Sequence, residues 1–158
     1  MKKKLRNKLG FTLVELLVVI SIISILTIIS VSSFTNAQIK GRDAQRKSDL
    51  DALSKALMMY FADKGVFPNS LEFGDTDTGL VDPNNLEMVY MRKIPLDPIN
   101  GGEYIYEYKV DGTSKSFNLF ANLENKEDSQ CRQEKYRVGS KEYCYGVTSP
   151  NIIVKDWP

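Results

Sequence analysis

A single carboxylate stands at the start of a long apolar segment. Glu15 precedes 19 residues, Leu16 to Phe34, that contain no charged residue, no Pro and no Gly. Such a carboxylate costs about 2.5–3.5 kcal/mol if it is carried to the bilayer centre, so it needs a partner. One candidate partner is Thr12, because Thr12 and Glu15 have the spacing of a capping box. The other is a free α-amine four residues away, which would exist only if the chain were cut between Gly10 and Phe11.

The two cysteines, Cys131 and Cys144, are the other residues with chemistry of their own. In an oxidising compartment we expect them to pair and close a 14-residue loop, a constraint worth about 3 kcal/mol in the chain-entropy model. A free or reactive thiol is the alternative. Their spacing and the absence of histidine exclude a CxxC metal site. Because we also find no nucleophile beside a base, we expect no enzyme.

Charge is distributed unevenly along the chain. The 158 residues carry a formal net charge of +1. Five of the 21 basic residues fall in the leader, residues 1–10, and the remainder is net −4. This balance argues against nucleic-acid binding by bulk charge. A local basic patch could override it; its members are Arg132, Lys135, Arg137 and Lys141.

The apolar segment has the length of a membrane span. At about 1.5 Å per residue, Leu16–Phe34 extends roughly 28 Å, which matches the hydrocarbon core of a bilayer. The basic leader predicts that the N-terminus stays in the cytoplasm and that the C-terminal part faces outward. An ordinary cleaved secretory signal is the alternative, but the apolar run is too long and Thr35–Ala37 is a poor cleavage site.

Hydroxyl side chains recur at every third position of this segment. Small residues of this kind allow helices to approach closely, but Ser and Thr hydroxyls also bond to carbonyls of their own helix. Both interpretations stay open at this point. The residues concerned are Ser21, Ser24, Thr27, Ser30 and Ser33.

The helix is predicted to continue beyond the apolar segment. Residues 35–64 form an amphipathic continuation, in which the spacing of Leu50, Leu53 and Leu57 predicts one buried face. The Lys64-Gly65 pair predicts the end of the helix. We therefore expect a helix from about Phe11 to Lys64.

Residues 65–158 show the signals of strands and turns. Alternation over Tyr104–Val110 and again over Phe117–Leu123, around an Asp-Gly turn, predicts an antiparallel hairpin. Its apolar face is expected to cover the leucines of the helix. Leu71–Leu86 is expected to be a loop, and Ile152–Val154 a further strand. The predicted fold is α+β, with a long N-terminal helix packed on a small antiparallel sheet.

The N-terminal residues resemble those of a known family. Gly10-Phe11-Thr12-Leu13-Val14-Glu15, between a short basic leader and an apolar helix, resembles the class III signal of type IV pilins and type II secretion pseudopilins. The resemblance implies that a prepilin peptidase removes residues 1–10 and methylates Phe11. It also implies that Glu15 neutralises the amine of a neighbouring subunit and that segment 11–34 lies in the filament core.

Other stretches extend this resemblance. Ile94–Pro98, before a Gly pair and a tyrosine-rich strand, resembles an element of the major pseudopilin of type II secretion, although Ile99 and Asn100 depart from the usual residues there. The loop 131–144 resembles the C-terminal disulfide region of many pilins.

Calcium is a further candidate that the resemblance raises. It places a weak calcium candidate after the last hairpin strand, at Glu124, Asn125, Glu127 and Asp128. Asp75 and Asp77 form a less complete fragment of a calcium loop, since the later bidentate Glu is missing. Acidic residues in a polar loop are usually just solvated, so we expect no required cofactor.

Three functions remain at this stage. The first is a structural subunit of a type IV pilus-like filament, held in the cytoplasmic membrane with its N-terminus inside and then assembled into an extracellular pilus. The alternative is a pseudopilin of a type II secretion system in a periplasmic pseudopilus. In either case the partners are the lipid bilayer, prepilin peptidase, a membrane assembly platform and other pilins. A remote third function is a single-pass anchor for an extracytoplasmic binding domain.

Overall fold

The computed structural model describes residues 10–74, 79–132 and 135–150. It has one helix, α1 (Leu13–Lys64), followed within these residues by seven short strands. The chain divides into two compact units, residues 1–38 and 39–158, and α1 runs through the boundary between them. A long helix with small antiparallel sheets confirms the predicted α+β fold.

Helix α1 ends where the sequence predicts. Gly65 adopts a positive φ of 68°, and its N–H donates to the carbonyl of Phe61 at 2.7 Å. Glycine takes this backbone conformation at no steric cost, so it closes the helix directly after Lys64. The N-terminal end lies at Leu13, two residues later than expected, because Thr12 serves as the cap.

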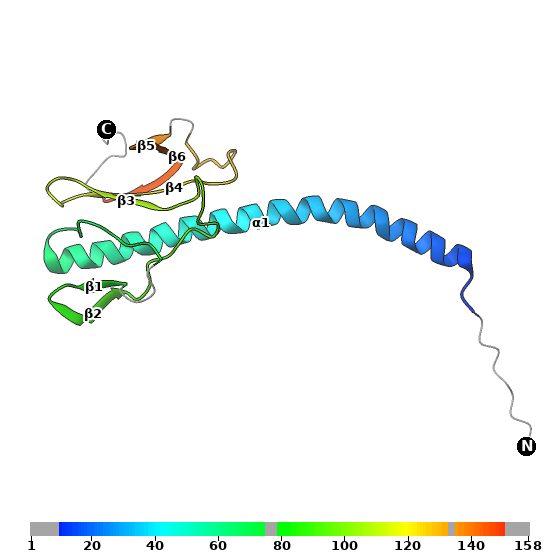
Figure 1. Cartoon of the computed structure of the whole chain (residues 1–158), viewed down its shortest axis with the longest axis horizontal. Helices are drawn as coiled ribbons and strands as arrows, with labels where there is room; N and C mark the ends of the chain where they lie inside the picture. The colour runs from blue at the N-terminus through cyan, green and yellow to red at the C-terminus, as the bar shows by residue number, and fades with distance from the viewer. Residues whose placement is uncertain (1–9, 75–78, 133–134, 151–158) are drawn as a thin grey trace, which may run out of the picture. The chain divides into compact units, whose positions relative to one another are not determined.

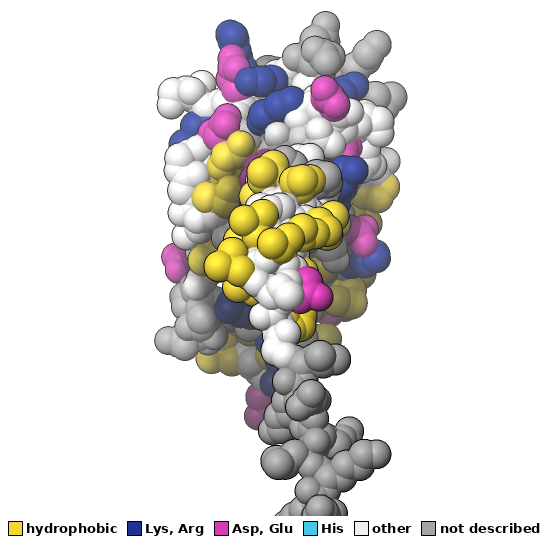
Figure 2. All heavy atoms as spheres, turned by 90° about the vertical axis from the view of Figure 1, so that its right-hand side faces the viewer, with side chains coloured by type: hydrophobic (Ala, Val, Ile, Leu, Met, Phe, Trp, Pro, Cys, Tyr) yellow, Lys and Arg dark blue, Asp and Glu magenta, His cyan; other side chains and the backbone are white. Residues whose placement is uncertain are grey.

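The first unit exposes its apolar side chains. By length and composition, the helix could cross a membrane, and Figure 2 shows hydrophobic side chains gathered on its N-terminal part. The hydroxyls of Ser21, Ser24 and Thr27 each donate to the carbonyl four residues earlier, at 2.7–2.8 Å. Their hydrogen bonds thus stay within the helix, which supports the interpretation that needs no neighbour.

In the second unit, helix α1 buries the predicted leucine face. Leu50, Leu53 and Leu57 are fully buried and belong to one core cluster with residues of the sheet β3–β4–β7. β3 (Glu107–Val110) pairs antiparallel with β4 (Phe117–Ala121), which confirms the predicted hairpin with shorter strands. β4 also pairs with β7 (Tyr145–Thr148), a strand that the sequence analysis did not predict.

The last part of the predicted loop Leu71–Leu86, from Leu80 onward, contains strands. β1 (Leu80–Asp82) pairs antiparallel with β2 (Asn85–Met91), so the prediction of an unstructured connection was wrong there. Asp82 and Asn84 lie at the turn of this hairpin, where Asp82 accepts a hydrogen bond from the N–H of Asn84 at 2.8 Å. Leu80 is buried in the core cluster, and this burial fixes the hairpin to the unit.

Within the second unit, the strands lie on two opposite sides of the helix (Figure 1). Figure 1 shows β1 and β2 on one side, and β3, β4 and a last hairpin on the other. That last hairpin pairs β5 (Tyr136–Val138) with β6 (Lys141–Tyr143). The predicted strand Ile152–Val154 and the acidic pair Asp75 and Asp77 lie outside the described residues.

Candidate functional site

The first candidate site is the start of helix α1. The N–H and the hydroxyl of Thr12 both donate to Oε2 of Glu15, each at 2.8 Å. In return, the N–H of Glu15 donates to the Thr12 hydroxyl oxygen at 3.2 Å. This reciprocal pattern is a capping box. In the single, unassembled chain, Thr12 is therefore confirmed as the partner of Glu15. Two N–H groups at the helix start, which have no carbonyl partner in the helix, are satisfied in this way.

The fold does not require a particular residue at positions 10 and 11, directly before the Thr12 cap. A side chain added at Gly10 would meet no atom within 4 Å, and its backbone does not require positive φ. Phe11 is 82% exposed. The fold of this chain therefore gives no reason for glycine and phenylalanine at these two positions.

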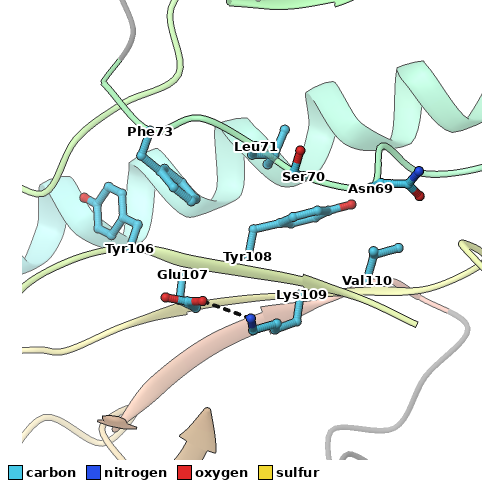
Figure 3. Close-up of a pocket in the computed structure, with 9 residues that line it drawn as sticks. All are labelled: Asn69, Ser70, Leu71, Phe73, Tyr106, Glu107, Tyr108, Lys109 and Val110. Carbon is cyan, nitrogen blue, oxygen red and sulfur yellow. Dashed lines mark ion pairs between the residues drawn. The ribbon is translucent and has the colours of Figure 1, made fainter. Parts of the chain in front are cut away.

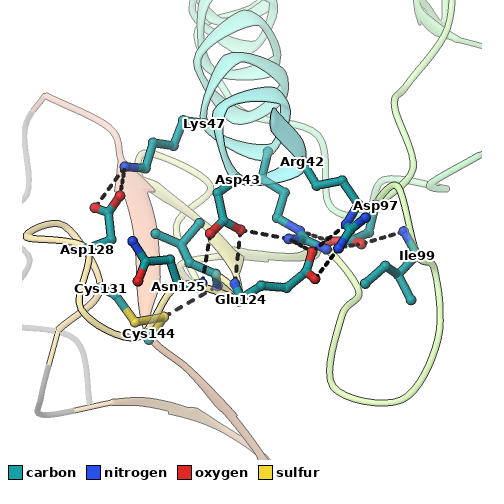
Figure 4. A network of polar contacts seen from close by, with 12 residues as sticks. Arg42, Asp43, Lys47, Asp97, Ile99, Glu124, Asn125, Asp128, Cys131 and Cys144 are labelled. Atoms are coloured by element: carbon teal, nitrogen blue, oxygen red, sulfur yellow. Dashed lines mark hydrogen bonds and ion pairs between the residues drawn. A yellow bond between two sulfur atoms is a disulfide. The ribbon is translucent and has the colours of Figure 1, made fainter. Parts of the chain in front are cut away.

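The second candidate site is a cluster of charged side chains in the second unit (Figure 4). At its centre, the fully buried Arg46 of helix α1 forms a bidentate ion pair with Asp97, with Nε–Oδ2 and Nη2–Oδ1 distances of 2.7 and 2.9 Å. Its third nitrogen, Nη1, donates to Asp43 and to Glu124, each at 2.7 Å. The guanidinium also lies 4.9 Å from the ring centroid of Tyr104. One arginine thus connects three segments of the chain.

Asp43 on helix α1 binds the loop after β4, and Glu124 in that loop binds the helix. Asp43 accepts hydrogen bonds from the backbone N–H groups of Glu124 and Asn125, both at 2.9 Å. The Glu124 carboxylate returns to the helix, where Arg42 donates to both of its oxygens at 2.7 and 2.6 Å. The loop after β4 is therefore held through its backbone and through a side chain.

A third ion pair anchors the same loop further along. Lys47 donates to both carboxylate oxygens of Asp128 at 2.8 Å, and Asp128 accepts from the N–H of Gln130 at 2.9 Å. The next residue, Cys131, forms the predicted disulfide with Cys144, which is therefore confirmed. The loop 124–131 is thus held at both ends.

These contacts shift the ionisation of the cluster. Hydrogen bonds from Arg42, and less from Arg46, lower the pKa of Glu124 to about 2 despite its partial burial. The ammonium of Lys47 lowers the pKa of Asp128. Burial lowers the pKa of Arg46, but its hydrogen bonds to Asp97, Glu124 and Asp43 more than compensate and raise it. Glu124, Asp128 and Arg46 are therefore charged at neutral pH.

Three of the four calcium candidates have their side-chain oxygens on protein donors, and the fourth, Glu127, does not within the part of the chain that the structure describes. Glu124 and Asp128 face cations of the helix. The side-chain oxygen of Asn125 accepts from the N–H of Glu127 at 3.2 Å, and the Glu127 side chain is exposed. Among the described residues, no group of three or more Asp, Glu, Cys or His side chains is placed to hold a metal ion.

The central members of the cluster were missed by sequence reasoning. Arg46 and Asp43 lie in the predicted amphipathic continuation 35–64, for which only the leucine face was predicted to be buried. Their spacing held a signal, because positions 43, 46, 50, 53 and 57 follow each other in steps of three and four, which places them on one helix face. Asp97 lies in the element Ile94–Pro98 that carried part of the resemblance, but its partner could not be read from the sequence.

The basic patch is partly neutralised. Arg137 and Lys135 both pair with Glu142, at 3.1 and 3.6 Å. Arg132 lies over the ring of Tyr136 at 5.5 Å, and Lys141 begins strand β6.

A groove of about 340 Å³ lies between strand β3 and residues 69–73 (Figure 3). Its two tyrosine hydroxyls already have partners, since Tyr106 donates to Asp49 at 2.9 Å and Tyr108 donates to the carbonyl of Pro68 at 2.7 Å. Burial, reinforced by Asp49, raises the pKa of Tyr106. Its charged lining residues, Glu107 and Lys109, pair with each other at 3.2 Å.

Two protein-family models match this chain, one near the N-terminus and one over most of the remaining residues. Residues 5–31 match the family described as "Prokaryotic N-terminal methylation motif", and residues 33–138 match "Type II secretion system (T2SS), protein G". The chain is 35% identical over 124 residues to the type II secretion system core protein G of Vibrio cholerae, which covers 75% of this chain and 84% of that protein. It is 30% identical over 121 residues to the core protein G of Pseudomonas aeruginosa, covering 73% and 83%. Solved structures gave no significant match.

These relatives support the second of the three functions better than the first. They are proteins of type II secretion systems, whereas the sequence analysis placed a pilus subunit first. The region that matches protein G includes helix positions 33–64 and most of the strands, so the match does not rest on the N-terminal motif alone. The chain belongs to the type II secretion system protein G family and carries the N-terminal methylation motif of pilin-like proteins.

Proposed function

We propose that this chain is a pseudopilin, a structural subunit that assembles into a periplasmic filament of a type II secretion system. The observation that carries the proposal is the match of residues 33–138 to protein G. The fold agrees with this role, because a filament subunit needs an apolar helix for the filament core and a compact head. We use the word head for the second unit, residues 39–158. A type IV pilus subunit is the second candidate, favoured by the disulfide loop 131–144.

Processing would precede assembly. In this proposal a prepilin peptidase cuts between Gly10 and Phe11 and methylates the new amine of Phe11. The open space around Gly10 supports this step, since glycine is not needed there by the fold and a processing enzyme supplies another reason for it. Before assembly the subunit spans the cytoplasmic membrane once, with the basic leader inside.

Assembly would use the carboxylate of Glu15. In the free chain Thr12 binds Oε2 of this carboxylate, and the negative charge is not neutralised by this contact. The ammonium of Phe11 in a neighbouring subunit would neutralise it in the apolar filament core, where an unpaired charge is costly. This pairing would also set the register between subunits.

Mass spectrometry of the intact chain tests the proposal. The protein is isolated from washed membranes and from sheared extracellular material, and its N-terminus is determined. A chain that begins at methylated Phe11 and is confined to the membrane fraction supports a pseudopilin. The same processed chain in sheared fibres supports a pilus subunit, and a chain that retains residues 1–10 contradicts both.

A substitution at Glu15 tests the assembly step separately. Glu15→Ala is expected to leave processing intact, since the cut lies five residues earlier, while it reduces filament assembly strongly. Crosslinked multimers and the mass of the processed chain report the two steps independently. Assembly at the parental level would contradict the pairing of Glu15 with the amine.

A further inference from the structure

The cluster around Arg46 differs from the calcium site that the resemblance suggests for this part of the head. We infer that three cations of helix α1, Arg42, Arg46 and Lys47, hold the loops of the head in place of a metal ion, so that the head folds without calcium. We call these three residues and their carboxylate partners Asp43, Asp97, Glu124 and Asp128 the cation clamp.

The carboxylate oxygens that calcium would need already have cationic partners. Calcium takes six to eight oxygen ligands at about 2.3–2.6 Å. In the cation clamp, both oxygens of Glu124 lie 2.6–2.7 Å from nitrogens of Arg42, and both oxygens of Asp128 lie 2.8 Å from Nζ of Lys47. A calcium ion would therefore have to displace these cations before it gained its ligands.

The charges of the cation clamp nearly balance. Four carboxylates without counter-ions would carry −4 and attract a dication. The three cations reduce this to −1, and each carboxylate has a cationic nitrogen within 2.6–2.8 Å. A calcium ion entering this arrangement would meet cations as well as carboxylates, which removes most of the attraction.

The carboxylates of the cation clamp also bind backbone N–H groups. Asp97 accepts hydrogen bonds from the N–H of Ile99 at 2.9 Å, while Asp43 and Asp128 accept from the N–H groups of Asn125 and Gln130. The carboxylates thus order the backbone of two turns, and the helix cations hold the carboxylates. A bound metal ion commonly orders loops in the same way, so the clamp makes one unnecessary here.

Amide hydrogen exchange on the full chain in detergent micelles tests this inference. Exchange at the N–H groups of Asn125 and Gln130 is compared in excess EDTA and in millimolar calcium chloride. The expected rates agree within about twofold, because calcium has no vacant ligand set to bind. Slowing by about tenfold or more on addition of calcium would overturn the inference.

A substitution tests the part played by the cations. Lys47→Met removes the ammonium that pairs with Asp128 and keeps an unbranched side chain that is one atom shorter. It is expected to accelerate exchange at Gln130 by about tenfold, whereas Lys55→Met serves as the control. Lys55 is also a helix lysine in an ion pair, with Asp51, but its side chain is 73% exposed. Equal rates in the two variants would overturn the role of Lys47 in the clamp.

Discussion

Arg46 and Asp97 form a bidentate ion pair in which both side chains are fully buried, although 51 positions separate them in the chain. A guanidinium and a carboxylate in this geometry share two parallel hydrogen bonds, which fixes their relative orientation as well as their distance. The pair therefore fixes the turn that follows Pro95 against one position of helix α1. Since Nη1 of the same arginine reaches Asp43 and Glu124, the loop after β4 is fixed against that position too.

Replacing Arg46 by methionine should destabilise the second unit strongly. Arg46→Met leaves Asp97 and Asp43 buried without their cation, a situation that typically costs about 3–5 kcal/mol of the free energy of unfolding. Urea unfolding of the variant in micelles, followed by circular dichroism, measures this loss.

The matched control for Arg46 is again Lys55→Met. The exposed pair Lys55–Asp51 is expected to contribute less than about 1 kcal/mol, because water and salt screen it. If Arg46→Met unfolded at the same urea concentration as Lys55→Met, the cluster would not be the anchor described above.

Acid should weaken the head through Glu124. Its pKa is lowered from an ordinary 4.5 to about 2 in the folded state, so the folded state binds fewer protons than the unfolded state between these values. The stabilisation, at most about 3 kcal/mol, is complete above pH 4.5 and is lost as the pH falls through about 2. Unfolding measured between pH 6 and 2 should show this loss in the parental chain.

Glu124→Gln isolates that contribution. The amide keeps the shape of the side chain and cannot ionise, so the variant should be less stable at pH 6 and lose less stability between pH 4.5 and 2. Parallel pH profiles of the two proteins would assign the acid sensitivity to other carboxylates, such as Asp111, whose pKa is also lowered to about 2, chiefly by its hydrogen bond from Thr113.

The same cluster shows how far sequence reasoning reaches. The leucine face and the β3–β4 hairpin were predictable, because burial of alternating or helically spaced apolar residues leaves a periodic pattern. Asp43 and Arg46 continue that face but are charged, and a buried charge is recognisable only when its partner is known. That partner, Asp97, is distant in sequence, so only the folded chain reveals the pair.

The β1–β2 hairpin was missed for a related reason. Its turn is rich in Asp and Asn, which are typical both of loops and of hairpin turns. β1 has only three residues, and β2 carries exposed apolar residues such as Leu86 and Met88, so neither strand shows a clear alternation of buried apolar and exposed polar residues. Burial of Leu80 against the core, a tertiary effect, decides the structure.

Removing the disulfide should loosen the end of the loop more than the core. Replacing Cys131 and Cys144 together by serine removes a constraint worth about 3 kcal/mol on the unfolded chain. The main core cluster does not include these cysteines, which form a small cluster with Leu123. We therefore expect the double variant to fold with a lower thermal midpoint, which circular dichroism with and without reductant measures.

Reductant provides the control for that experiment. It should lower the midpoint of the parental chain and leave the double variant unchanged, because the variant has no cysteine left to reduce. A parental midpoint that did not respond to complete reduction would show that the loop is held by Lys47–Asp128 and the Asp43 contacts alone.

Thr12 should influence assembly through Glu15. Its hydroxyl donates to Oε2 of Glu15 and accepts from the N–H of Glu15, so it positions the carboxylate that the proposed function assigns to subunit pairing. Thr12→Val keeps the shape and removes both contacts, at a cost of about 1 kcal/mol to the helix start. If the same positioning serves the assembled state, filament yield should fall by about fivefold, the factor that this energy corresponds to.

Two further measurements separate positioning from other effects of Thr12. Thr12→Ser restores the hydroxyl and should restore assembly, because the capping box accepts either residue. The mass of the chain should show equal processing at Gly10 in all variants, which excludes poor cleavage as the cause. Thr12→Val could assemble at the parental level while Glu15→Ala did not. In that case the Glu15 carboxylate would pair with the neighbouring amine without help from Thr12, and the Thr12 hydroxyl would only cap the helix of the unassembled subunit.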